Sequence, residues 1–397
     1  MAPSALTPTQ RHGGGLALAL TLAALPAPAP AAPAKRPAPA APGATYTLEA
    51  RTVTGLGAGG MGSAEMMRMV MGGGASSTTS SRSLELRLQG SRVPAEAPKA
   101  EHRIPAGLAL GTALPLLSSG PSRGTEAPEP LERPKGRLLI FRGCGETAGS
   151  GQPEVLDLAK LVPDAQQLAA LQGAMGKQGG RGVAREPAAA AITGTWPNGD
   201  SQGALAATAS LVGDHSVVSN YAPELRFRVE ASHDFLAPLQ LSASPAGAAW
   251  RLSWQPVATV LGYQAMATSA GKGPDELVIW TSSSSGWAGS AIPANLDRRS
   301  AAQLIAQKVL LPPEATSCSI SAQASAAMAM PVLQVTAYGD PLTVTGPAGA
   351  TPWRVSLRRE STASRLLMAG MPGADDAAGG EAEPTQPRGF KLFPGLF

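Results

Sequence analysis

Residues 250–256 read Trp250-Arg251-Leu252-Ser253-Trp254-Gln255-Pro256, and this stretch decides the fold class. Large apolar side chains alternate here with polar ones, so Trp250, Leu252 and Trp254 share one face. An alternation with a period of two is typical of a strand that is buried on one side only. Pro256 closes the strand because proline cannot donate to a sheet ladder. We therefore expect Trp254 to be buried in the core of a β-sheet protein.

The same period recurs along most of the chain, which predicts a mainly β fold. Two helices interrupt it. One is expected at Asp164–Met175, and the other runs from a capping Asn295 to Val309 before Pro312 and Pro313 stop it. Strands are expected at 46–54, 84–88, 108–117, 137–142, 225–229, 239–243, 250–254, 263–267, 277–281, 316–322, 332–338 and 353–359.

The segment from Pro238 to Ser361 resembles a fibronectin type III module. The pattern that carries the resemblance is Leu252-x-Trp254-x-Pro256 followed by Gly262-Tyr263. The resemblance implies an immunoglobulin-like sandwich in which Trp254 packs near Tyr263 and Val335. The helix near residues 295–309 departs from that module and would be an insert.

The N-terminus has the pattern of an export signal. Arg11 precedes a short apolar run from Leu16 to Leu25, and two A-x-A sites lie between Ala29 and Ala34. A charged start, an apolar stretch of about 10 residues and a small-residue cleavage site are typical of secretory signals. The run is shorter than the roughly 20 residues that span a bilayer. The alternative is a low-complexity Ala/Pro tail.

Composition supports a chain of several parts with many turns, because glycine (46) and proline (37) are both abundant. We expect five segments. They are a signal peptide at 1–34, an Ala/Pro linker at 35–44, a β-rich N-terminal domain with a helix at 45–235, the fibronectin type III-like sandwich with its helical insert at 236–361, and a low-complexity tail at 362–397.

The net charge limits the expected partners, and the cysteines indicate the expected compartment. The formal net charge is only +4, and no cluster of five basic residues occurs, so nucleic acid is not an expected partner. The mature chain shows no transmembrane segment. The two cysteines, Cys144 and Cys318, predict a disulfide in an oxidising compartment. The alternative is a pair of buried free thiols.

Two motifs in the first quarter of the chain suggest ligands, but each has a simpler interpretation. Gly55-x-Gly57-x-x-Gly60 has the spacing of a dinucleotide-binding loop. The flanking strands alternate, whereas the parallel strands of that fold are apolar on both faces, so a plain glycine loop is favoured. The methionines between Met61 and Met71 could bind Cu(I) or form an adaptable apolar surface. No cofactor is predicted.

Three histidines of the mature chain are candidate zinc ligands: His102, His215 and His233, the last two beside Asp214 and Asp234. Three histidines can hold zinc with an open position, but none has the spacing of a known zinc motif. Ser269-x-x-Lys272 matches the nucleophile motif of penicillin-recognising enzymes. We place it in a β-turn rather than at a helix start, where that chemistry needs it.

The sequence thus predicts an exported envelope protein with a binding or structural role. The whole chain resembles uncharacterised exported proteobacterial proteins, a likeness that implies no activity. Another envelope protein or a carbohydrate is the expected partner. The alternative is a periplasmic hydrolase or metal-dependent enzyme with a site between the domains. Convergence of His102, His215 and His233 in one pocket would favour that alternative. No catalytic, metal-binding or cofactor-binding residue is predicted.

Overall fold

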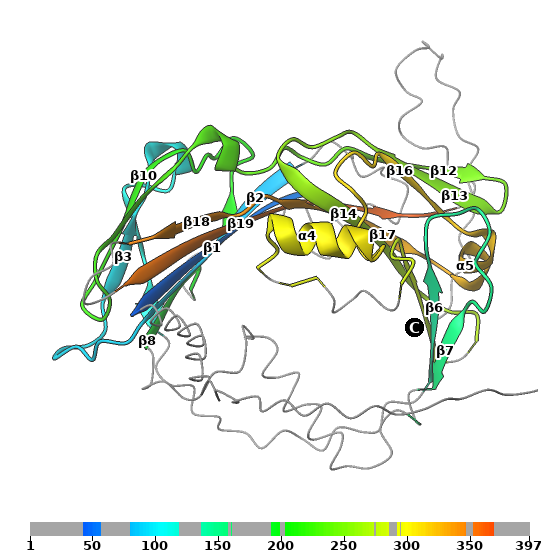
Figure 1. The fold of residues 1–397 in the computed structure, drawn as a ribbon, viewed down its shortest axis with the longest axis horizontal. Helices are drawn as coiled ribbons and strands as arrows, with labels where there is room; N and C mark the ends of the chain where they lie inside the picture. Colours follow the sequence, from blue (N-terminus) through cyan, green and yellow to red (C-terminus); the bar gives the residue numbers. More distant parts are fainter. Residues whose placement is uncertain are drawn as a thin grey trace, which may run out of the picture. The chain divides into compact units, whose positions relative to one another are not determined.

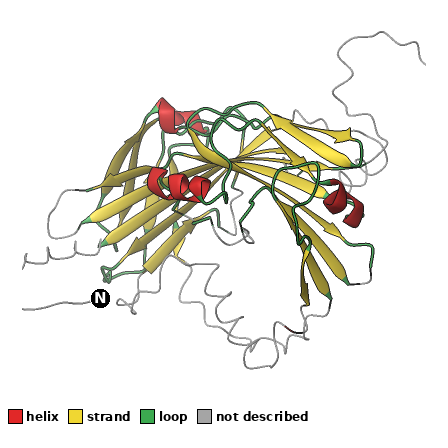
Figure 2. Cartoon of the chain, turned by 45° about the vertical axis from the view of Figure 1, so that its right-hand side comes forward, coloured by secondary structure: helices red, strands yellow, loops and turns green. Residues whose placement is uncertain are grey.

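A computed structural model describes residues 43–56, 80–118, 136–157, 160, 192–198, 203–273, 275–285, 292–293, 295–346 and 352–368. All of them belong to one compact unit, residues 41–397. The described part is mainly β, as the alternating patterns predict, and Figure 2 shows how few helical segments it contains.

Several predictions fall outside the described residues. These are the signal peptide, the helix at Asp164–Met175, the methionine cluster and most of the C-terminal tail.

Figure 1 labels most of the strands and both helices. Their bounds are β1 Ala44–Gly55, β2 Ser80–Gly90, β3 Ala100–Arg103, β4 Ala113–Pro115, β5 Leu117–Ser118, β6 Arg137–Arg142, β7 Glu154–Asp157, β8 Ile192–Trp196, β9 Ala204–Leu205, β10 Gly213–Ser219, β11 Leu225–Val229, β12 Leu241–Ala246, β13 Ala249–Trp254, β14 Val260–Ala270, β15 Glu276–Thr281, α4 Arg298–Ala306, β16 Ser317–Ile320, α5 Ala322–Ala327, β17 Val332–Gly339, β18 Leu342–Thr345 and β19 Trp353–Leu366. Short 3-10 turns lie at Ala106–Leu108 and Ala231–His233.

One long sheet runs through the described part of the protein. Its order is β5-β8-β2-β1-β19-β17-β14-β15-β6-β7, with β18 also pairing with β19 and β9 with β2. The 14-residue strand β19 joins the two halves of this sheet. It pairs in parallel with β1 from Trp353 to Ser364 and antiparallel with β17 from Glu360 to Leu366. Strands from the two ends of the sequence therefore become neighbours.

A second sheet, in the order β11-β10-β3-β4, covers the β8-β2-β1-β19 half of the long sheet. The residues between the two layers form a continuous apolar core. Inward positions follow the period of two. In β11, for example, Leu225, Phe227 and Val229 are buried while Arg226 and Arg228 are exposed. We call this half the first sandwich.

A third sheet, in the order β12-β13-β16, packs on the β19-β17-β14-β15 half, and we call this the second sandwich. Trp254 is 4% exposed, and its ring centroid lies 5.5 Å from that of Tyr263, which is fully buried. Val335 is buried in the same core. The predicted burial of Trp254 near Tyr263 and Val335 is confirmed, because the alternation through Leu252 and Ser253 sets the register.

The helix α4 begins later than predicted. Asp297, not Asn295, is the N-cap: its carboxylate accepts a 2.7 Å hydrogen bond from the backbone N–H of Ser300, and the Ser300 hydroxyl accepts one from the Asp297 N–H. This reciprocal capping box satisfies two backbone donors at once, which Asn295 cannot do for a helix starting at Arg298. The helix packs through Ala301 against β14, on the side of the sheet away from the core of the second sandwich.

Other boundaries also differ from the prediction. The helix α4 ends at Ala306 rather than at Val309, and the strand expected at 239–243 is β12, Leu241–Ala246. The strand expected at 316–322 ends at Ile320, because Ser321 caps the short helix α5 by accepting a hydrogen bond from the Ala324 N–H. The strand expected at 108–117 is instead the two short strands β4 and β5 after a 3-10 turn. The last strand runs seven residues beyond Arg359, to Leu366.

The hairpin β6–β7 is attached to the second sandwich at one edge. β6 pairs in parallel with β15, and the backbone then crosses to β16, where the Gly145 N–H donates to the Ser319 carbonyl. Here Cys144 and Cys318 form the disulfide that the sequence predicts, with 5.0 Å between their Cα atoms. The bond therefore ties the segment after β6 to the sheet that contains β13 and β16.

Candidate functional site

A buried chain of hydrogen bonds crosses the core of the first sandwich. The Tyr46 hydroxyl on β1 lies 2.9 Å from Nδ1 of His102 on β3, and Nε2 of His102 lies 3.0 Å from Nδ1 of His215 on β10. Nε2 of His215 lies 2.7 Å from the carbonyl oxygen of Leu211. Tyr46 and His102 are fully buried and His215 is 2% exposed.

The strand pattern explains why these polar side chains point inward. Glu101 and Arg103 flank His102, and alternation therefore places His102 on the face opposite to them. His215 is paired with Phe227 across the β10–β11 ladder. The two rings stack at 4.9 Å with an interplanar angle of 8°, and the His102 ring stacks on His215 at 5.1 Å. The two histidines are thus packed as core aromatic residues.

The Leu211 carbonyl, at one end of this series of hydrogen bonds, fixes the direction of each of them. A carbonyl can only accept, so His215 carries its proton on Nε2 and offers the lone pair of Nδ1. His102 then donates from Nε2 and accepts at Nδ1 from the Tyr46 hydroxyl. All four polar groups are satisfied when both imidazoles are neutral.

The surroundings hold both histidines in this neutral form. Burial lowers the pKa of His102 well below its ordinary value of 6.5, and the neighbouring His215 lowers it further. Burial also lowers the pKa of His215, although the hydrogen bond to Leu211 and the charge of Asp214 act against it. The pKa of Tyr46 is raised by burial. Neither imidazole of the pair is therefore poised to exchange a proton near neutral pH.

The third predicted histidine does not join this pair. His233 lies in the 3-10 turn, with Nδ1 3.1 Å from the Ser232 hydroxyl. The acids beside the histidines have other partners: Asp214 pairs with Arg228, and Asp234 accepts from the Ser210 hydroxyl. Within the described ranges, no three His, Cys, Asp or Glu side chains form a cluster that could hold a metal ion.

The Ser269 hydroxyl is engaged in the fold. Ser269 lies in β14 rather than in the predicted turn, because that strand continues to Ala270. Its Oγ donates to the Ala270 carbonyl and accepts from the backbone N–H groups of Ala329 and Met330. The hydroxyl therefore fixes the segment before β17 and is not a free nucleophile. Gly55, the first glycine of the predicted dinucleotide loop, ends β1 with φ 78°, and a Cβ there would collide with the Ser364 carbonyl.

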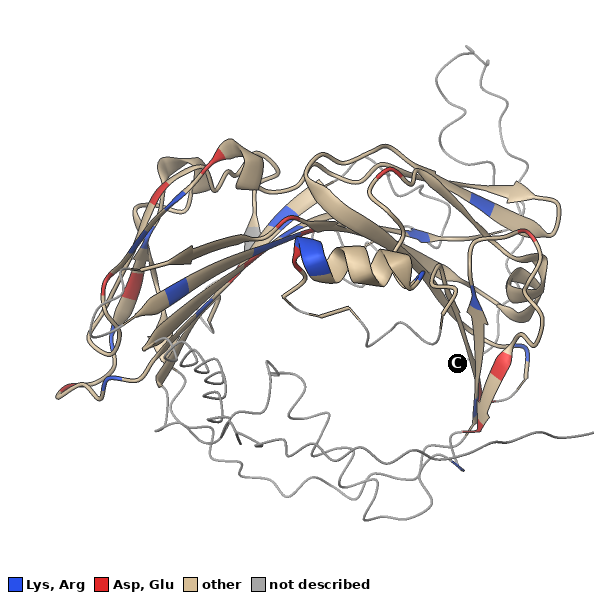
Figure 3. Ribbon diagram, viewed as in Figure 1, with Lys and Arg blue, Asp and Glu red and all other residues tan. Residues whose placement is uncertain are grey.

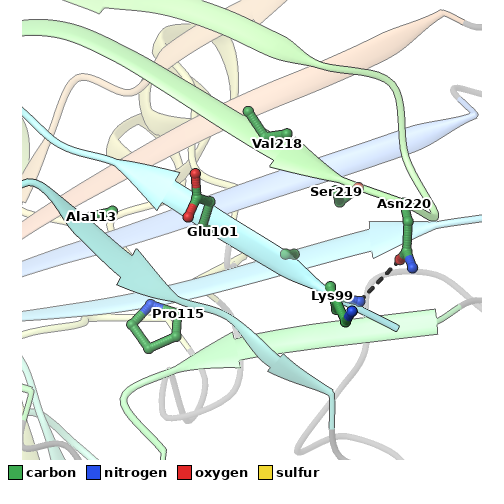
Figure 4. A pocket seen from close by; sticks show the side chains of 8 residues that line it. Lys99, Glu101, Ala113, Pro115, Val218, Ser219 and Asn220 are labelled. Carbon is green, nitrogen blue, oxygen red and sulfur yellow. Dashed lines mark hydrogen bonds between the residues drawn. The ribbon is translucent and has the colours of Figure 1, made fainter. Parts of the chain in front are cut away.

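A shallow pocket of about 530 Å³ lies on the solvent face of the β10-β3-β4 sheet. Figure 4 shows residues that line it: Glu101 lies among Ala113, Pro115 and Val218, and Lys99 lies beside Asn220. Asn220 is not free, because its side chain accepts from the Lys99 backbone N–H and donates to the Ala97 carbonyl. The charges of Lys99 and Glu101 have only exposed partners, Glu96 and Arg103.

A network of charges covers the outer face of the long sheet in the first sandwich. Arg51 on β1 contacts Glu49 and Glu85 at 2.7 and 2.6 Å, and Arg358 on β19 contacts Glu49 at 3.1 Å. The carboxylate of Glu360 lies 3.9 Å from Arg51, and burial raises its pKa while Arg51 opposes that shift. Figure 3 shows Lys/Arg and Asp/Glu interspersed along the strands. We interpret this network as cross-strand pairing within the sheet.

Sequence reasoning found two members of the buried chain but not their arrangement. The sequence offers His102 and His215 as candidate zinc ligands, whereas in the structure they are hydrogen-bonded to each other and His102 also to Tyr46. The pattern Glu101-His102-Arg103 was the available signal, because charged neighbours on both sides of a strand residue place it on the inner face. The pocket residues carry no sequence pattern of their own.

Comparisons with known proteins add no relative: no family model matches the chain, and neither a curated protein nor a solved structure is similar to it. None of the helices in the described ranges is both long enough and apolar enough to cross a bilayer.

Proposed function

We propose that this chain is an exported envelope protein that binds a partner and does not catalyse a reaction. Two observations support export. The first is the signal-like N-terminus, and the second is the Cys144–Cys318 disulfide, since such bonds persist in oxidising compartments. The observation that carries the binding role is the pocket on the solvent face of the first sandwich.

We also propose that residues 238–361 form a fibronectin type III-like module, and the strand order supports this. In immunoglobulin-like sandwiches the first, second and fifth strands lie in one sheet, and the third, sixth and seventh in the other. Here β12, β13 and β16 form one sheet, while β14, β17 and β19 lie in the long sheet. The helix α4, inserted between β15 and β16, departs from that plan. Modules of this architecture support many functions, so the fold alone does not name one.

The chemistry of the pocket fits an extended segment of another protein. Lys99 and Glu101 offer one charge of each sign, and Ala113, Pro115 and Val218 on the flanking strands β4 and β10 offer apolar surface beside them. Their present ion pairs are exposed and weak, so a partner can replace them at little cost. The pocket has no aromatic side chain, which disfavours a sugar ring as its occupant.

Three candidate catalytic residues of the sequence, His102, His215 and Ser269, have structural roles in the fold. His102 and His215 are buried and neutral, and the Ser269 hydroxyl holds backbone groups. None of them lines the pocket. A hydrolase needs a nucleophile, a base and an oxyanion donor within reach of one another, so these structural roles favour binding.

A matched pair of variants tests the proposal. Ala113→Trp fills the pocket, whereas Ser216→Trp adds the same ring to the solvent face of β10, at a position that does not line the pocket. The mature protein is applied to an array of peptides from envelope proteins and to an array of glycans. We expect peptide binding by the wild type and by Ser216→Trp, and at least about a tenfold loss in Ala113→Trp. Binding to glycans alone, or binding that Ala113→Trp leaves unchanged, would show that the proposal is wrong.

A further inference from the structure

The buried hydrogen-bond chain joins two layers of the first sandwich. Tyr46 belongs to β1 of the long sheet, whereas His102 and His215 belong to β3 and β10 of the covering sheet. We propose that the His102–His215 pair is an acid-sensitive latch: it holds the β11-β10-β3-β4 sheet against the long sheet, and protonation releases it.

The geometry leaves no place for an additional proton. A proton on His215 would occupy Nδ1, so His102 would have to offer the lone pair of Nε2 and carry its own proton on Nδ1. That proton would face the Tyr46 oxygen, and the hydroxyl hydrogen of Tyr46 would then lose its acceptor. A proton added directly to His102 has the same result. Since Tyr46 is fully buried, water cannot replace the lost acceptor in the closed state.

The charged groups around the pair do not compensate for a buried imidazolium. Asp214, beside His215, turns outward to Arg228. Asp234 accepts from the Ser210 hydroxyl and the Leu211 N–H. On β2, Arg82 donates to the Ala209 carbonyl and lies over the Phe235 ring. Tyr221, the remaining titratable neighbour, has a pKa raised by burial to about 12 and stays neutral.

Within the described ranges, the carboxylates of Asp214 and Asp234 are not hydrogen-bonded to either imidazole. An added proton would therefore place an unpaired cation in the core of the first sandwich.

The sign of the pH effect follows from this arrangement. In the open state the two imidazoles meet water and take up protons as the pH falls through their ordinary value of 6.5. In the closed state they remain neutral, since their pKa values are lowered. The closed state is therefore fully favoured above that pH, and its advantage falls as the pH drops below it. Each proton taken up changes the opening equilibrium by about tenfold per pH unit.

The latch also affects the proposed binding surface. Glu101 and Val218 of the pocket lie on β3 and β10, next in sequence to His102 and Val217, so opening would dismantle the pocket. This consequence rests on the proposed function. The latch itself does not rest on it, and the experiment measures opening of the sheet in the absence of any ligand.

Amide hydrogen exchange of the mature, oxidised protein at about pH 7.5 and about pH 5, corrected for intrinsic exchange rates, tests the latch. We expect protection in β3, β10 and β11 to fall by about tenfold to a hundredfold per pH unit below 6.5. Protection in β13, β14 and β17 of the second sandwich serves as the internal reference and should change less. Equal loss in both sandwiches would overturn the proposal.

Variants separate the pair from general acid sensitivity. The double variant His102→Gln/His215→Gln cannot be protonated, and it should lose the additional pH dependence of β3 and β10. His233→Gln, the matched control outside the core, should retain it. If the double variant does not fold, NMR of ring-labelled histidines in the wild type decides instead. Imidazoles of His102 and His215 that titrate near 6.5 while β3 and β10 stay protected would refute the latch.

Discussion

Replacing Arg359 by methionine should destabilise the protein far more than the same change at its neighbour Arg358. Arg359 lies in β19 with only 3% of its surface exposed. Its guanidinium donates to the carbonyl oxygens of Asp340, Ser232 and Asp234, and to the Thr259 hydroxyl, over distances of 2.7–3.3 Å. These acceptors belong to three separate turns, so a single side chain fixes the junction of the two sandwiches.

The expected magnitude follows from what methionine leaves behind. It keeps the aliphatic stem of Arg359 but removes all five hydrogen bonds. Orphaning buried acceptors costs about 1–3 kcal/mol each. Relief from burying a cation offsets part of that sum, since burial lowers the pKa of Arg359. We expect a net loss of about 3–5 kcal/mol, as for other broken buried ionic networks.

Arg358→Met is the control. It removes a partly exposed side chain on the other face of the same strand, which pairs with Glu49, and should cost at most about 1 kcal/mol.

Urea denaturation of the oxidised protein, followed by tryptophan fluorescence, measures both variants. Arg359→Lys is an informative third variant, because one ammonium cannot reach acceptors on opposite sides of the guanidinium. We expect it to lose most of the stability that Arg359→Met loses. A free energy of unfolding for Arg359→Met within about 1 kcal/mol of the wild-type value would refute the reasoning. Equal losses in the two methionine variants would do the same, because the turns would then be stable without the Arg359 hydrogen bonds.

Three further changes have expected outcomes. Trp254→Ala should lower the free energy of unfolding by about 3–5 kcal/mol, because it opens a cavity beside Tyr263, and a wild-type midpoint in urea would contradict this. Cys144→Ser should cost roughly 4–5 kcal/mol if loop entropy dominates, with dithiothreitol having a similar effect on the wild type and none on the variant. N-terminal sequencing of the protein from a periplasmic extract should begin near Lys35, and an intact Met1 there would rule out cleavage.

The strands that could be predicted from the sequence are those with a local signal. The strands β1 and β11 alternate strictly, and β2, β13 and β17 alternate over part of their length. The alternation reports which side chains face the core. It does not report the partner of a strand. Glu49 and Arg358 are 309 residues apart and yet pair across β1 and β19. No local sequence pattern predicts a parallel pairing between strands so far apart in the sequence.

The candidate site shows the same limit. The charged neighbours of His102 predict that it faces inward. Its contact with His215 depends on the register of β3 against β10, in which Val217 lies opposite His102. Arg359 lies at an inward position of β19, between the buried Leu357 and Ser361, where a pattern reader expects an apolar residue. Acceptors from three turns, carbonyls from two of them and the Thr259 hydroxyl from the third, make its burial tolerable. Only the fold brings those turns together.

The edges of the three sheets favour a partner that contacts a sheet face rather than one that adds a strand. Pro245 interrupts the edge strand β12, Pro115 ends β4, and Pro153 directly precedes β7. The edge strand β11 carries the exposed Arg226 and Arg228. Prolines and charges at these positions are the devices that keep sheet edges from pairing with other chains. A binding role must therefore use side chains on a sheet face, and the described pocket on the β10-β3-β4 sheet offers such a surface.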